Sequence, residues 1–159
     1  MRQIVTILIL LYSIGFSEIN AQKTDTLNVY YQALKLHLDY WDSFHKERPD
    51  LVKIPSVYYI EQDEYSTDSL PSLISGHKIE ILKQADIYTL TKNKKGIALI
   101  AIRPARWENG RLMIYVIDFG VTRDRDNYEY SNGGGSAFQV VCMPNENGLG
   151  LKIIHQGGI

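Results

Sequence analysis

The chain has 159 residues, with 17 Lys and Arg against 18 Asp and Glu and a formal net charge of −1. Such a balance gives no field that would attract nucleic acid or an anionic membrane, so we expect neither as a partner. The arginines of "RPARWENGR" and "VTRDRD" alternate with acidic or apolar residues rather than forming a basic patch.

The first 21 residues have the pattern of a secretory signal peptide. Arg2 precedes the apolar stretch Ile4–Phe16, and Ala21 supplies a small residue at the expected cleavage bond. The apolar stretch is shorter than the ~20 residues that a membrane-spanning helix needs. We therefore expect residues 1–21 to be removed, residues 22–159 to form a single α+β domain, and the mature protein to be periplasmic or secreted, without membrane attachment.

The segment Thr24–Arg48 is predicted to be a long helix, with an N-cap among Thr24, Asp25 and Thr26 and a stop at Pro49. At ~100° per residue its polar side chains fall into one narrow arc, and apolar side chains occupy the rest. So wide an apolar surface predicts that a curved sheet wraps around the helix.

His37 lies within the apolar arc of this helix, beside the aromatic residues Tyr30 and Trp41. Two interpretations stay open: a core histidine bonded to a carbonyl or a tyrosine hydroxyl, or a polar group at the floor of a ligand pocket. The four histidines show no HxH, HxxxH or HExxH spacing, and no cysteine cluster joins them, so we expect neither a metal nor another cofactor.

Strands are predicted along the rest of the chain. Residues 57–60 and the segment "HKIEIL" indicate two of them, separated by a polar connection, and "KQADIYTLTKNKKG" fits a short helix or another strand. "GIALIAIRP" and "RLMIYVIDFGV" flank Asn109-Gly110, which predicts a tight hairpin. "SAFQVVCMP" and "GLGLKIIHQ" form a second predicted hairpin around residues 145–148. The expected architecture is a long N-terminal helix packed on a curved, mostly antiparallel sheet of about five strands.

Three consecutive glycines, Gly133 to Gly135, precede an apolar run. A phosphate-binding loop would require GxGxxG or GxxxxGK[ST] leading into a helix, and neither pattern is present. We interpret Ser131–Gly135 as a bulge or turn that needs positive φ angles. Cys142, the single cysteine, is expected to be a small buried residue rather than a nucleophile.

Asp118 interrupts an otherwise apolar strand. The "DFG" triplet that it begins lacks the other kinase motifs. The carboxylate is predicted to lie either at the solvated end of the strand or buried against a partner such as Arg103, Tyr30 or His37. If buried, it is a candidate general base.

In this arrangement of one broad-faced helix and a meander of long strands, residues 26–159 resemble the nuclear-transport-factor-2-like and cystatin-like folds. The chain is also similar in type to small exported bacterial proteins. The first resemblance implies a curved sheet that encloses a pocket beside the helix, and it assigns no catalytic residue.

The leading functional hypothesis is a noncatalytic binding domain of the bacterial envelope for an unknown small ligand, lined by Tyr30, His37 and Trp41, with Asp118 or Arg103 orienting the ligand. One alternative is a module that binds an envelope protein through its hairpin tips, with Trp107 as the anchor. Another is a small hydrolase or isomerase that uses Asp118 with a histidine or a tyrosine.

Overall fold

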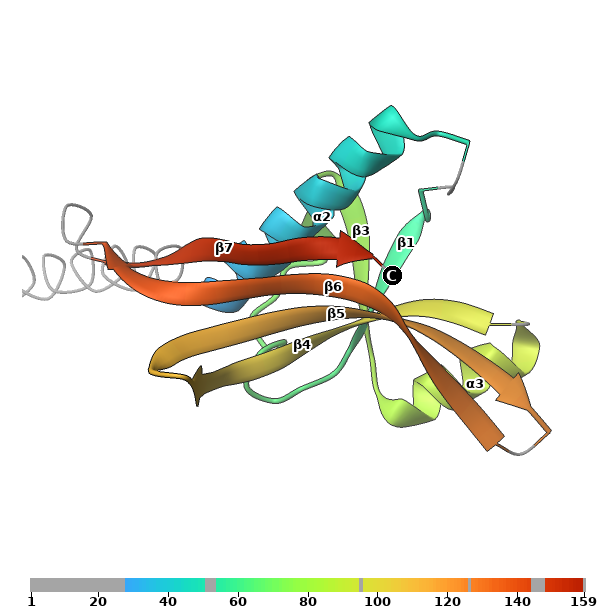
Figure 1. Ribbon diagram of the computed structural model, residues 1–159. Coiled ribbons are helices and arrows are strands. Elements are labelled where there is room, and N and C mark those ends of the chain that lie inside the picture. The colour runs from blue at the N-terminus through green and yellow to red at the C-terminus, as the bar shows by residue number, and fades with distance from the viewer. Residues whose placement is uncertain (1–27, 51–53, 95, 126, 144–147, 159) are drawn as a thin grey trace, which may run out of the picture.

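The computed structural model describes residues 28–50, 54–94, 96–125, 127–143 and 148–158. They form an α+β fold of two helices and one seven-stranded mixed sheet, shown in Figure 1. The expected fold class is therefore confirmed at this level. The expected signal peptide and its cleavage bond lie outside the described residues.

Helix α2 (Val29–Glu47) occupies the segment in which the long helix was predicted. The side chain of Asn28 caps its first turn by accepting a hydrogen bond from the backbone N–H of Tyr31 at 3.0 Å. The helix ends just before Pro49, as its rigid ring requires. The predicted start at residues 24–26 lies outside the described part of the chain.

The sheet has seven strands in the order β2-β3-β1-β4-β5-β6-β7, so the expectation of about five was wrong. It is also mixed, because β1 pairs in parallel with both β3 and β4. A two-residue strand inside a polar, proline-interrupted connection leaves no alternating pattern, and parallel pairing across that connection leaves no local turn signature. The bounds are β1 (Val57–Glu61), β2 (Leu73–Ile74), β3 (His77–Leu82), β4 (Gly96–Glu108), β5 (Arg111–Asp124), β6 (Asn127–Met143) and β7 (Gly148–Gly158).

The strands β4 to β7 form an antiparallel meander. The hairpin at Asn109-Gly110 is confirmed, with positive φ angles of 49° and 75° at these two residues. The strand predicted from Ser136 begins earlier, at Asn127, and pairs with β5 along its length. The predicted turn at residues 145–148 lies largely outside the described residues.

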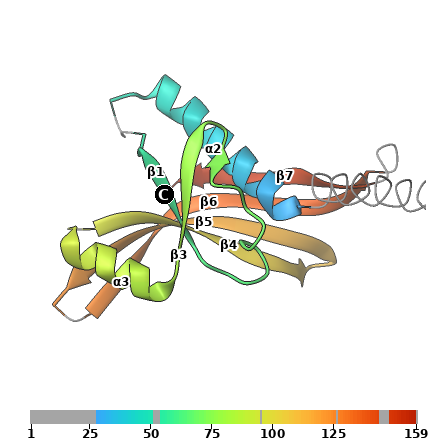
Figure 2. The ribbon, with the colours of Figure 1, turned by 180° about the vertical axis from the view of Figure 1, so that it is seen from behind.

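The two helices cover opposite faces of the sheet. Ile100 and Ile102 of β4 pack in the core beneath α2, whereas Ile97 and Leu99 pack in a second core beneath helix α3 (Gln84–Asn93). Successive side chains of a strand point to opposite faces, which places the two cores on different sides. Figures 1 and 2 show α2 and α3 at opposite ends of a strongly twisted sheet.

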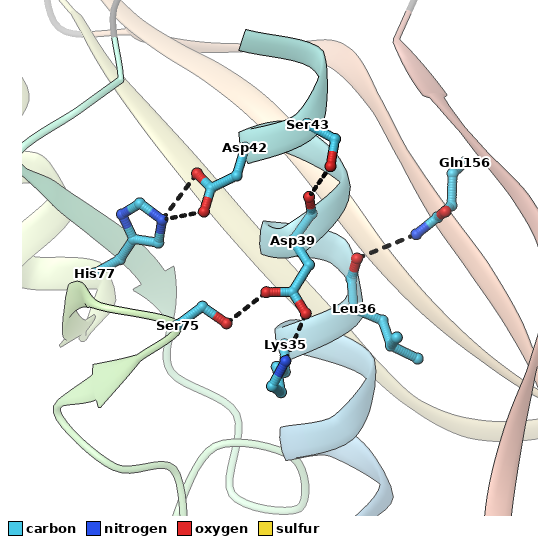
Figure 3. A network of polar contacts seen from close by, with 8 residues as sticks. All are labelled: Lys35, Leu36, Asp39, Asp42, Ser43, Ser75, His77 and Gln156. Atoms are coloured by element: carbon cyan, nitrogen blue, oxygen red, sulfur yellow. Dashed lines mark hydrogen bonds and ion pairs between the residues drawn. The ribbon is translucent and has the colours of Figure 1, made fainter. Parts of the chain in front are cut away.

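The polar side of α2 also has contacts (Figure 3). The Ser75 hydroxyl donates to Asp39 at 2.6 Å, and His77 Nε2 lies 2.9 Å from both carboxylate oxygens of Asp42. Burial opposes ionisation of Asp39, but hydrogen bonds from Lys35 and Ser75 outweigh it and lower the pKa of this carboxyl. The β2–β3 hairpin therefore contacts the polar side of α2 through Ser75 and His77.

Candidate functional site: a pocket around Asp118

A pocket of about 320 Å³ lies between the C-terminal half of α2, strand β1, the beginning of strand β4 and the second half of strand β5. It is open to solvent on one side, and its walls combine aromatic and aliphatic side chains with one carboxylate. The volume is at the small end of the range of ~300–1,000 Å³ for ligand sites. The lining residues are Trp41, His45, Pro55, Val57, Tyr58, Ala98, Leu99, Ile100, Asp118, Phe119, Gly120 and Gly133.

Asp118 is the charged residue of this wall and is held in place from α2. One carboxylate oxygen lies 3.1 Å from His37 Nε2, and the other accepts a hydrogen bond from Trp41 Nε1 at 3.2 Å. The Asp118 side chain remains 21% exposed, whereas His37 is completely buried behind it. The carboxylate is thus oriented by two ring N–H donors while part of it faces the pocket.

His37 has partners at both ring nitrogens. Its Nδ1 lies 2.8 Å from the hydroxyl oxygen of Ser136, a residue that is itself buried. The tautomer with its proton on Nε2 donates to Asp118 and accepts at Nδ1 from the Ser136 hydroxyl, so one imidazole serves both partners. Ser136 therefore positions His37, and His37 positions the carboxylate of Asp118.

The helical period brings the aromatic side of the pocket together. His37, Trp41 and His45 are spaced four residues apart and share one face of α2. The ring centroid of Trp41 lies 6.4 Å from that of His37 and 5.8 Å from that of His45. In this position the indole N–H of Trp41 contacts Asp118, and the ring of Trp41 forms part of the pocket wall.

A bulge in β6 shapes the opposite side. The pairing of β5 with β6 shifts between Asp118 and Phe119, which leaves Gly133 as the extra residue. Gly134 and Gly135 have φ angles of 109° and 151°, so the predicted bulge with positive φ is confirmed. Because Gly133 has no side chain, this position leaves the pocket open beside Asp118.

Two buried polar groups in the wall have no hydrogen-bond partner among the described residues. They are the imidazole of His45, at both nitrogens, and the hydroxyl of Tyr58. Burial, together with the charges of Asp42 and Asp118, raises the pKa of Tyr58 to about 12. Unsatisfied buried polar groups are uncommon in folded proteins, and here both belong to residues of one pocket.

The structure brings some of the predicted ligand-binding residues together and separates others. Trp41 and Asp118 line the pocket, and His37 lies directly behind Asp118. Tyr30 packs in the main core, where its hydroxyl accepts from the backbone N–H of Ala105 at 3.1 Å. Arg103 lies on the opposite face of the sheet and pairs with Glu61 at 3.3 Å.

Asp118 does not lie at a solvated end of its strand, since β5 continues to Asp124. Of the three partners proposed for it from sequence, the structure pairs it with His37, and it adds Trp41. The expectation for Cys142 was wrong, because this residue is exposed. Trp107, the proposed interaction anchor, is 74% exposed near the end of β4.

Three residues of the site, Ser136, His45 and Tyr58, were not predicted from the sequence. The spacing of four residues from Trp41 was a signal for His45, because it continues the face that carries His37. Tyr58 lies in the predicted short strand, but nothing in that strand shows which side faces the helix. Ser136 directly follows the glycines and pairs with Val116 across the sheet, a relation that only the strand register reveals.

No group of three or more His, Cys, Asp or Glu side chains in the described residues could hold a metal ion. No helix within that part of the chain is long and apolar enough to span a membrane. No protein-family model, no curated protein and no solved structure matches the chain. The functional argument therefore depends on the pocket itself.

Proposed function

We propose that the protein is an exported, noncatalytic binding domain that holds a small, largely apolar ligand in the pocket around Asp118. The observation that carries the proposal is a carboxylate fixed by His37 and Trp41 in the wall of an open, mainly apolar pocket. Ligand sites in proteins combine apolar walls with a few fixed polar groups in this way. The unpartnered His45 and Tyr58 add support, because both belong to the same wall.

The neutral apolar dye N-phenyl-1-naphthylamine tests this proposal, since its fluorescence rises on transfer from water to an apolar site. We expect saturable binding to the wild-type protein. Ala98 is an exposed residue of the pocket wall, so Ala98→Trp fills the pocket from strand β4 without enlarging a core residue. This variant should weaken dye binding by about 10-fold or more.

Ala85→Trp is the matched control, because Ala85 is also exposed but lies on α3, outside the pocket. It should bind the dye as the wild-type protein does. Equal binding by the Ala98→Trp variant and the wild type would contradict the proposal, as would a loss of binding in the Ala85→Trp control.

A hydrolase or isomerase is the second candidate, favoured by the chain of contacts from Ser136 through His37 to Asp118. This chain has the composition of a Ser-His-Asp triad, but Ser136 is only 3% exposed and is not part of the pocket wall. Asp118 as a general base is the form of this hypothesis that the geometry allows. A rate on ester, glycoside or isomerisable ketone substrates that Asp118→Asn abolishes would favour it.

The protein-interaction alternative is favoured by one observation, the 74% exposure of Trp107. An exposed tryptophan beside a hairpin turn is a typical interface anchor. Co-purification of an envelope protein with the wild type but not with Trp107→Ala would support this alternative.

A further inference from the structure

The electrostatics of the pocket indicate the charge of its ligand. Among the described residues that line it, Asp118 is the one aspartate, and there is no Glu, Lys or Arg. Its two oxygens each have one protein contact, to His37 and to Trp41. An ionised carboxylate has about four acceptor positions, so capacity for further donors remains on the exposed part of this group.

Three basic side chains of the described chain have acidic partners other than Asp118. Arg103 pairs with Glu61 on the other face of the sheet, and Lys35 pairs with Asp39 on the polar side of α2 at 2.6 Å. His77 is held by Asp42. Among the described residues no Lys or Arg side chain pairs with Asp118, and a partly desolvated carboxylate favours a positively charged partner.

The aromatic side chains of the pocket wall also favour a positively charged ligand. The rings of Trp41 and Tyr58 line the pocket on the face of the sheet that carries Asp118, and the faces of aromatic rings attract positive charge. The raised pKa of Tyr58, caused first by burial and then by the charges of Asp42 and Asp118, is in keeping with a negative pocket wall. A metal ion would require several oxygen ligands, and the wall supplies one carboxylate.

We infer that the ligand is an organic ammonium ion: a protonated primary, secondary or tertiary amine whose N–H bonds to Asp118 and whose apolar body fills the space between Trp41 and Tyr58. This inference rests on the proposed function. It excludes a carboxylate ligand, which Asp118 repels, and it ranks a neutral alcohol below the amine because an alcohol leaves the charge of Asp118 uncompensated.

The test uses three ligands of one skeleton: 2-naphthylmethylamine, 2-naphthylmethanol and 2-naphthoate. Their affinities are measured at pH 7 by displacement of N-phenyl-1-naphthylamine from the wild-type protein and from Asp118→Asn. For the wild type we expect the amine to bind at least about 10-fold more tightly than the alcohol and the naphthoate to bind most weakly. In the Asp118→Asn protein the preference for the amine over the alcohol should be lost while the alcohol still binds.

A wild-type protein that binds the alcohol as tightly as the amine, or the naphthoate more tightly than either, would overturn the inference but leave the binding function standing. An amine preference that persists in Asp118→Asn would also overturn it. If neither the dye nor any of the three ligands binds, the proposed function fails together with the inference.

Discussion

His37 shows how one buried residue can have a structural role and still determine a binding site. Both of its nitrogens have partners, at 2.8 Å to Ser136 and 3.1 Å to Asp118. The residue is fully buried and lies outside the pocket wall, which fits the core interpretation. Its contact nevertheless holds the carboxylate that faces the pocket. The histidine is a core residue as the first interpretation had it, but the expected partners, a carbonyl or a tyrosine hydroxyl, were wrong, and His37 lies behind the pocket rather than at its floor.

Tyr58 gives a prediction at the same scale. Its pKa of about 12 in the folded protein lies above the ordinary tyrosine value of 10.0, so the folded state retains the phenolic proton where the unfolded chain loses it. The contribution of this group to the free energy of unfolding is fully present below pH 10 and is lost as the pH rises through 12. Wild-type protein should therefore lose more stability than Tyr58→Phe between pH 10 and 12.

Urea denaturation of both proteins across this pH range measures the difference. At neutral pH the Phe variant should be more stable by about 1 kcal/mol, because it removes a buried hydroxyl that has no partner among the described residues. A difference absorbance titration of tyrosinate should show one group fewer titrating near pH 12 in the variant. Parallel pH profiles of stability would contradict the assignment.

At the scale of elements, the bulge in β6 depends on backbone conformations that favour glycine. Gly135 has a φ of 151°, and a Cβ placed there would lie 2.2 Å from the carbonyl oxygen of Val116. A Cβ at Gly133 would meet its nearest atom at an ordinary 3.5 Å. The two glycines therefore differ sharply in their tolerance of a side chain.

Gly135→Ala should destabilise the protein by more than about 2 kcal/mol or prevent folding, because backbone atoms must move to relieve the contact. Gly133→Ala, the matched control, should change the free energy of unfolding by less than about 1 kcal/mol. Urea denaturation of both variants provides the comparison. Similar losses at the two positions would show that the bulge is not built as described.

Most elements could be predicted from local patterns. The apolar period of α2, the Asn109-Gly110 turn and the glycine bulge all depend on neighbouring residues, and the structure has each of them. The two-residue strand β2 and the parallel pairing of β1 could not be predicted, because strand order is set by contacts distant in sequence. The segment at α3 is too short for its apolar pattern to distinguish a helix from a strand, and the structure has a helix there.

At the scale of the whole molecule, the site joins segments that are far apart in the chain. The contacts of Asp118 with Trp41 and His37 span 77 and 81 residues, and the contact of His37 with Ser136 spans 99. Polar residues in apolar patterns identified His37 and Asp118 from the sequence. Ser136 and Tyr58 could not be found in this way, because their roles follow from sheet register and from which strand face α2 covers.

The central claim is that Asp118, held by Trp41 and His37, faces a pocket that takes a ligand. The two tryptophans give a direct measurement, since Trp41 donates its indole N–H to Asp118 whereas Trp107 is 74% exposed. Indole signals in ¹H–¹⁵N NMR spectra, assigned with Trp107→Phe, should show slow hydrogen exchange for Trp41 and fast exchange for Trp107. On addition of 2-naphthylmethylamine, only the Trp41 signal should shift. Equal exchange rates, or a shift at Trp107 with none at Trp41, would contradict the account.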